Sequence, residues 1–292
     1  MRRALLALVL TTSACTVTGT AVPVPGAGNL AVVDGPGTAA ALAAVKVAAE
    51  AVFSYDSTSP AGHDQAAGAN LTGDAKKQLS ALFEQIGKSP AAVHLTTHVR
   101  QSAALELTGN RVRELAVLEQ VNGTTKGLAT VAFTALKADG RWRISDIAVS
   151  PVQPPPAPQP DDGSPAGLRD AALAGVRTIA GALFTTDSAD PVGTFARAEA
   201  VTADPLLSDY RKKRNDNLDA IHKSGVKVTL GPNPMAGVTA LSGERASVLF
   251  FTTLQVTTTA GQVTSQPFTA ELEVVRAGKD WKATDVRAIS GA

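Results

Sequence analysis

The spacing of apolar residues changes from a helical to a strand period within each half of the chain. In the first half, apolar positions recur at helical intervals in three segments, 38–54, 60–70 and 72–87, the third opening on Thr72 as an N-cap. From residue 92 onward they alternate with polar residues, as in VHLTTHVR. That alternation is typical of strands with one buried face.

Turn signals divide the alternating stretch into four strands. Asn110, Asn122-Gly123 and Asp139-Gly140 lie where tight turns are expected. The strands between them are predicted at 92–107, 111–121, 126–137 and 141–149. Because hairpins join consecutive strands, the sheet should be antiparallel.

The second half repeats this order. Its helices are predicted at 168–184, 192–200 and 204–223, the last closed by Gly225. Four strands follow, at 226–241 with an interruption at GPNPMAG, 245–257, 262–276 and 281–289. Three helices followed by four antiparallel strands predict an α+β unit whose helices cover one face of the sheet.

Individual residues repeat as well. The only two tryptophans, Trp142 and Trp281, each begin the last strand of a half. Other matches keep the same order: Phe53 with Phe184, Asp56 with Asp187, Thr72 with Thr202, Asp74 with Asp204, and LTGNR with LSGER. We therefore predict two tandem domains, at residues 38–150 and 166–292.

The first residues resemble a bacterial lipoprotein signal. MRRALLALVLTTSAC has a basic start, a short apolar stretch and small residues before Cys15. Cys15 is the only cysteine, so it forms no internal disulfide, and it lies where a lipobox thiol is joined to diacylglycerol. Residues 1–15 are predicted to be this signal, with Cys15 as the lipidation site. A plain secretory signal with an incidental cysteine is the alternative.

Two further segments lack any apolar period. Residues 16–37 are rich in Thr, Val, Pro and Gly, and we predict a flexible tether between the membrane and the first domain. Residues 151–165, PVQPPPAPQPDDGSP, predict a semi-rigid proline-rich linker between the domains.

The ordered motifs resemble the NTF2-like superfamily, and within it the actinobacterial proteins associated with mammalian-cell-entry (Mce) transport systems. The residues that carry the resemblance are Phe53 with Asp56, LTGD at 71–74, and DGRW at 139–142 followed by Ile144 and Ile147. It implies two tandem NTF2-like domains, each with three helices packed on a curved four-stranded antiparallel sheet. Proteins of this group usually have one domain and an uncleaved transmembrane helix, whereas this chain has two domains and a lipobox.

The histidines do not suggest a metal site. His94 and His98 lie four residues apart on a predicted strand, which separates them by about 13 Å. That distance is too long for one ion, so we expect both side chains to be exposed. His63 and His222 have no carboxylate or cysteine at ligand spacing and are expected to be solvated or to cap a helix.

The carboxylates leave an enzyme open as the alternative. Asp56 and Asp187 each follow a first helix, where the resemblance would place an acid inside the cone of an isomerase or dehydratase. We favour a turn role, because Asp followed by Ser is a turn signal. Asp146 and Asp285 are expected on the tryptophan face of the last strands, each paired with an arginine.

Charge and motifs narrow the function further. A net charge of +1 and 4% aromatic residues argue against nucleic acid as a partner. The basic run YRKKRN at 210–215 is either the solvated face of a helix or a contact with anionic lipid. We found no phosphate-binding glycine loop, nucleophile elbow or HExxH motif, and predict no cofactor, metal or catalytic residue.

The function predicted from the sequence is a non-catalytic one. We expect an exported protein, anchored through Cys15 on the extracytoplasmic face of the cell membrane, that serves as an accessory or scaffold. The resemblance implies an Mce-type lipid transport system with other envelope proteins as partners. The apolar content of each cone would also accommodate a lipid or another apolar small molecule.

Overall fold

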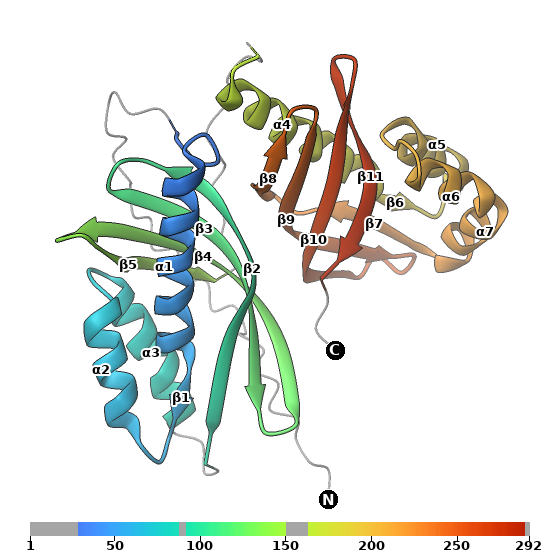
Figure 1. Ribbon diagram of the computed structural model, residues 1–292. Coiled ribbons are helices and arrows are strands. Elements are labelled where there is room, and N and C mark those ends of the chain that lie inside the picture. Colours follow the sequence, from blue (N-terminus) through green and yellow to red (C-terminus); the bar gives the residue numbers. More distant parts are fainter. Residues whose placement is uncertain (1–28, 88–91, 150–162, 290–292) are drawn as a thin grey trace, which may run out of the picture.

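The computed structural model describes residues 29–87, 92–149 and 163–289, which form an α+β protein with one large antiparallel sheet (Figure 1). The first half consists of α1 (Gly35–Phe53), β1 (Tyr55–Asp56), α2 (Pro60–Asn70), α3 (Ala75–Gly87), β2 (His94–Leu107), β3 (Arg111–Asn122), β4 (Thr125–Ala138) and β5 (Arg141–Val149). The second half consists of α4 (Pro165–Leu183), β6 (Thr186–Asp187), α5 (Pro191–Ala200), α6 (Leu206–Lys212), α7 (Arg214–Ser224), β7 (Val226–Leu230), β8 (Met235–Ser242), β9 (Arg245–Thr258), β10 (Val263–Ala277) and β11 (Asp280–Ala288).

The two halves repeat the same strand pairings. Asp56 in β1 pairs with His94 at the start of β2, and Asp187 in β6 pairs with Lys227 in β7. The last two strands of each half share a bulge, at Ser145 and at Thr284. Both bulge hydroxyls donate to a carbonyl of the preceding strand, that of Thr134 or that of Glu273. The repeat seen in the sequence is therefore also a repeat of backbone hydrogen bonding.

In the segment before the third helix of each half, the structural match between the two halves is offset by one residue from the match seen in the sequence. Leu71 forms an isolated parallel bridge with Ile144, and Thr202 forms one with Ala283. Leu71, and not Thr72, is thus the structural counterpart of Thr202. The prediction that Thr72 caps the helix is wrong, because its N–H donates to the carbonyl of Ile144 and α3 begins only at Ala75.

One sheet runs through both halves. Its strand order is β11-β10-β9-β8-β2-β3-β4-β5, and the halves meet where Ala104 in β2 pairs with Val238 in β8. The sheet faces without helices also pack on each other. A buried apolar cluster there takes residues from both halves: Ala103, Leu115, Val117 and Ala132 from the first, and Met235, Leu249 and Phe251 from the second.

Each half has its own core on the helix side of its strands. In the first, α1 buries Val45, Val52 and Phe53, and the Phe53 ring lies 5.8 Å from that of Phe133 in β4. In the second, α4 buries Val176 and Ile179 in a cluster that also holds Phe250, Leu272 and Trp281. Burial of each such large apolar side chain stabilises the fold by about 1.5–3 kcal/mol.

The segment 29–34 is part of the folded structure. The Asn29 amide donates to the carbonyl of Leu105 and accepts from the N–H of Leu107, while Ala31 is fully buried. Arg169 of α4, only 3% exposed, donates from Nη1 to the carbonyls of Asn29 and Ala31. We call these contacts of Asn29, Ala31 and Arg169 the Arg169 brace.

The brace corrects the predicted tether, which was expected to continue to Gly37. Helix α1 already begins at Gly35, because Asp34 accepts a hydrogen bond from the N–H of Gly37 as its N-cap and Pro36 fits the first turn. The signal at residues 1–15 with Cys15, the rest of the tether and most of the proline-rich linker lie outside the described residues.

Two predicted elements of the second half are divided. The helix expected over 204–223 is broken at Lys213 into α6 and α7, and Gly225 ends α7 in a left-handed conformation as expected. The strand expected over 226–241 forms β7 and β8. Both pair antiparallel with β9, β7 with its last residues and β8 with its first, so GPNPMAG interrupts one strand path without reversing its direction.

Helix α1 is long and apolar enough to cross a membrane by length and composition. In the structure it packs along the sheet, with Ala41, Val45, Ala49 and Val52 fully buried. This is the burial pattern of a core helix.

Candidate functional site

The carboxylates that follow the first helix of each half are turn residues. Asp56 accepts from both the N–H and the hydroxyl of Thr58, at 2.8 and 2.6 Å, and these bonds lower its pKa with help from nearby His94. Asp187 accepts from the N–H of Ala189 and lies 3.2 Å from the Lys227 ammonium, which together lower its pKa. Both groups are ionised at neutral pH and engaged locally, as the turn interpretation predicts.

The carboxylates of the last strands face away from the tryptophans. Ile144 and Asp146 pair with adjacent residues of β4, and adjacent residues of a strand point to opposite faces. The bulge at Ser145 thus moves Asp146 off the Trp142 face, and the bulge at Thr284 does the same for Asp285. The predicted face is wrong for both, because alternation was counted without the bulge.

The predicted arginine partner is present for only one of these two carboxylates. Asp285 lies 3.3 Å from the Nε of Arg287. Asp146 instead accepts from the amide of Gln78, whose carbonyl oxygen accepts from the N–H of Ile147, so this carboxylate fixes α3 to β5.

The four histidines lie apart from one another. His94 and His98 are exposed on β2 and His222 is exposed in the last turn of α7, as predicted. For His63 the capping alternative holds and the solvated one does not, because it bonds a carbonyl in the last turn of α1. Its side chain is only 9% exposed, donates to the carbonyl of Val52 and stacks against Phe83 with ring centroids 4.4 Å apart. Within the described residues, no group of three or more His, Cys, Asp or Glu side chains could hold a metal ion.

Sequence reasoning missed Glu114, the buried acid of the first half. It lies on the helix side of β3, between Val112 and Ala116, and opposite Ala104 and Phe133 on the neighbouring strands. It is 1% exposed, and neither carboxylate oxygen has a hydrogen-bond partner of regular geometry. Burial raises its pKa to about 8, which Ser102 on β2 opposes in part. The signal was a glutamate at an apolar position of the alternating run RVRELAVLEQ.

The basic run at 210–215 spans the break between α6 and α7. Arg211 and Arg214 both pair with Glu199 of α5, at 3.0 and 3.4 Å, and the Arg214 guanidinium lies 5.0 Å from the centre of the Phe195 ring. The run is exposed apart from Tyr210, yet its two arginines hold three helices together. It is thus more than a solvated helix face.

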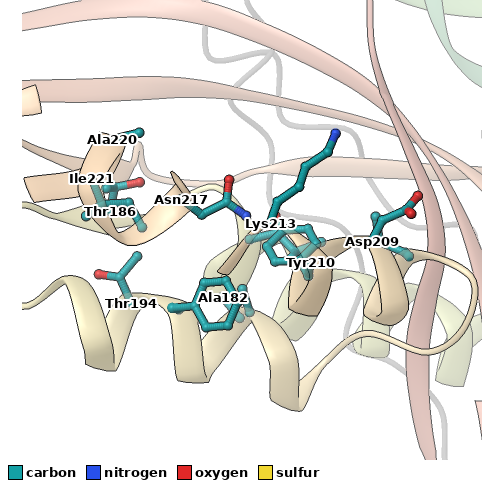
Figure 2. A pocket seen from close by; sticks show the side chains of 13 residues that line it. Ala182, Thr186, Thr194, Asp209, Tyr210, Lys213, Asn217, Ala220 and Ile221 are labelled. Atoms are coloured by element: carbon teal, nitrogen blue, oxygen red, sulfur yellow. The ribbon is translucent and has the colours of Figure 1, made fainter. Parts of the chain in front are cut away.

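A cavity of about 460 Å³ lies among these helices. Its apolar wall includes Leu183, Phe195, Leu206 and Ile221, while Tyr210, Asp209, Lys213 and Asn217 supply polar groups (Figure 2). Burial raises the pKa of Tyr210, so its hydroxyl is a neutral donor at physiological pH. The cavity is a candidate ligand site, and sequence reasoning did not identify it.

The two tryptophans occupy equivalent strand positions but differ in burial. Trp281 is 6% exposed, and α4 approaches it so closely that a methyl group at Gly175 would lie 2.5 Å from its Cβ. Trp142 is half-buried against the first core, with the Lys137 ammonium 5.9 Å from its ring centre. Neither ring takes part in a polar site.

No protein-family model matches the chain, and no curated protein matches it in sequence. Among solved structures, a periplasmic fragment of TraM is 12% identical and matches 42% of this chain and 97% of its own, with a TM-score of 0.35. CagV, a VirB8 homologue of the Helicobacter pylori type IV secretion system, is 10% identical over 41% of this chain and 99% of its own, with a TM-score of 0.33. An Ntf2-like protein involved in plasmid conjugation is 10% identical over 85% of this chain and 95% of its own, with a TM-score of 0.25. Likenesses this distant establish neither family nor function.

Proposed function

We propose that this chain is an exported, lipid-anchored envelope protein built from two tandem NTF2-like domains, and that it serves as a non-catalytic accessory or scaffold. The observation that supports this proposal best is the way the halves are joined. A shared sheet, a buried cluster on the helix-free faces and the Arg169 brace join both halves into one body. A rigid body of this size is suited to a scaffold that holds its partners at a fixed distance from a membrane.

The positions and contacts of the candidate acids support a non-catalytic role. Asp56 and Asp187 are engaged in turns, Asp146 fastens a helix, and Glu114 is sealed in the core. A general base needs to reach the proton that it removes, to within hydrogen-bond distance. None of these four carboxylates lines the described cavity.

The resemblance of the sequence to Mce-associated proteins suggests an Mce-type lipid transport system as the setting. In that setting the protein would be held at the extracytoplasmic face through Cys15 and would contact other envelope proteins. The buried cluster already occupies part of the helix-free faces. We therefore expect partners at the helix side or at the edge strands β5 and β11.

The lipid anchor is tested by metabolic labelling. Radiolabelled palmitate should enter the wild-type chain and not the Cys15→Ala variant, because Cys15 is the only thiol. Conversion of Cys15 to Ser provides a matched control that keeps side-chain size. Equal labelling of wild type and variants would contradict lipidation.

The accessory role is tested by affinity capture of the full-length chain from envelope extracts. Mce transport components should be recovered with the wild type, and recovery should fall for Cys15→Ala if membrane placement matters. Capture that recovers no transport component from an extract containing them would contradict the accessory role while leaving the lipid anchor standing.

An isomerase or dehydratase is the second candidate, and Glu114 is the observation that favours it. A carboxyl group with a raised pKa on the helix side of an NTF2-like sheet is suited to proton transfer. Enolisable ketones incubated in D₂O with the protein would then exchange their α-protons faster than in buffer, and Glu114→Gln would abolish the excess. Exchange at the buffer rate for the wild type contradicts this candidate.

A further inference from the structure

The cavity among α4–α7 exists because two rings of the first half are replaced by threonines in the second. Tyr55 in β1 and Thr186 in β6 occupy the same register position, each preceding the Asp that pairs with the next strand. His63 and Thr194 are each the fourth residue of a helix that begins with proline, α2 or α5. The residues of the first half fill space that their counterparts leave open.

In the first half these rings form a packed aromatic cluster. Tyr55 lies 5.3 Å from His63 and 4.9 Å from Phe83, measured between ring centres. In the second half both Thr186 and Thr194 line the cavity instead. A fold that fills this place in one repeat and leaves it open in the other has diverged at that place.

The cavity belongs to the helices and not to the sheet. Its lining residues come from the end of α4, from β6 and from α5, α6 and α7, with no residue from β7–β11. These three last helices gather at the end of the second half that points away from the first half (Figure 1). The Arg211 and Arg214 pairs with Glu199 brace its walls.

Two polar side chains of the cavity, those of Lys213 and Asn217, are not engaged with other described residues, whereas the Thr194 hydroxyl accepts from the N–H of Asp187 and from Arg197. No carboxylate of the described chain lies within ion-pair distance of the Lys213 ammonium, and the Asn217 side chain makes no hydrogen bond there. Figure 2 shows Lys213 extending away from the other lining residues, with Asn217 and Tyr210 beside its base. An ammonium, an amide and a neutral phenol are donors suited to an anion.

Charge around the helix break favours an anion over a cation. Four consecutive cations at 211–214 lie near three carboxylates, those of Glu199, Asp209 and Asp216, which leaves an excess of positive charge. Asp209 also lines the cavity, so the excess is small and suits a single negative charge.

We propose that this cavity binds a single-chain amphiphile with one anionic headgroup, such as a fatty acid, with its chain against Phe195 and Leu206 and its carboxylate near Lys213. The volume of about 460 Å³ lies in the lower half of the range of small-molecule sites, roughly 300–1,000 Å³. That volume suits one alkyl chain better than a two-chain lipid. The proposal goes beyond the scaffold function proposed above and rests on the cavity alone.

The test is calorimetric titration of the purified full-length chain with dodecanoate, below its micelle concentration. The wild type should bind dodecanoate, and Thr186→Tyr/Thr194→His, which installs the first half's rings, should reduce binding more than tenfold. Ala198→Leu narrows the same cavity from α5 and replaces the double variant if that fails to fold. No binding by the wild type, or equal binding by folded filled variants, would overturn the site.

The headgroup is tested with a matched pair of lysines. Lys213→Met should weaken dodecanoate binding about tenfold, because one charged hydrogen bond is lost. Lys212 is adjacent in sequence but does not line the cavity, so Lys212→Met should change binding less than twofold. Equal effects, or tighter binding of dodecyltrimethylammonium than of dodecanoate, would overturn the anionic assignment. Because no partner or anchor takes part, failure here is distinguishable from failure of capture or labelling.

Discussion

Glu114 is the residue whose chemistry departs most from its surroundings. A carboxylate buried among Val112, Ala116 and Phe133 without a hydrogen-bond partner is disfavoured in its charged form, which is why its pKa rises from 4.5 to about 8. Between those values the folded state keeps a proton that the unfolded state has lost. Stability therefore falls as pH rises through this window, and the loss levels off above about pH 8.

Glu114→Gln should remove this pH dependence. The slope that the group contributes approaches about 1.4 kcal/mol per pH unit inside the window, so the variant should be more stable than the wild type at pH 9. Asp56, Asp187 and Glu119 have lowered pKa values, so they change the stability with pH only below about pH 5. Urea unfolding at pH 5, 7 and 9 measures the effect. Parallel pH profiles for variant and wild type would show that Glu114 is charged in the folded protein.

The tryptophans should differ in their contribution to stability. Trp281→Ala is expected to lower the free energy of unfolding by about 3–5 kcal/mol, because a nearly fully buried ring is lost beside a glycine that cannot fill the space. Trp142→Ala should cause a smaller loss, because that ring is only partly buried. Denaturant titration of both variants provides the comparison. Equal losses would contradict the difference in burial.

At the scale of elements, the two halves approach each other closely at β2 and β8. Gly237 in β8 lies against β2 so tightly that a methyl group there would be 2.7 Å from the Cβ of Ala103 and 3.2 Å from the Cδ2 of Leu105. The shared sheet thus depends on one position without a side chain. The neighbouring residues Ala104 and Val238 pair across these strands.

Gly237→Ala should destabilise the protein by about 1–3 kcal/mol, because the strands must separate to admit the methyl group. Gly127→Ala in β4 is the matched control, since a methyl group there meets nothing within 4 Å. Thermal unfolding of the two variants tests the contact. A Gly237→Ala variant as stable as Gly127→Ala would mean that β2 and β8 are not in contact in solution.

At the scale of the whole molecule, the Arg169 brace joins the start of the folded chain to the second half. Arg169 carries a buried charge that is satisfied by Asp170 at 2.7 Å and by two carbonyls of the segment before α1. Removing one partner of such a network leaves the others buried without partners, which costs several kcal/mol.

Arg169→Met should therefore uncouple the halves. We expect the single unfolding transition of the wild type to separate into two, with an overall loss of about 3–5 kcal/mol. Calorimetry of the full-length chain measures this. Arg177→Met, on the same helix but outside the brace, is the control. One unchanged transition for Arg169→Met would show that the buried cluster alone holds the halves together.

Much of the fold could be predicted because its signals are local. Alternation placed the strands of the first half within two residues, and Asp139-Gly140 marked a real turn, with both residues at positive φ. The predictions that were wrong also have physical causes. Bulges at Ser145 and Thr284 reverse alternation without a sequence signature, and the burial of the His63 ring depends on Phe83, which lies in a different helix.

The sequence by itself determined the order of helices and strands, the repeat, and the turn roles of Asp56 and Asp187, because these depend on residues close together in the chain. Only the tertiary structure decided how the halves join, that Glu114 is buried, and that Thr186 and Thr194 open a cavity. Packing between segments far apart in sequence decides burial and empty space. The chemistry of this protein depends on both.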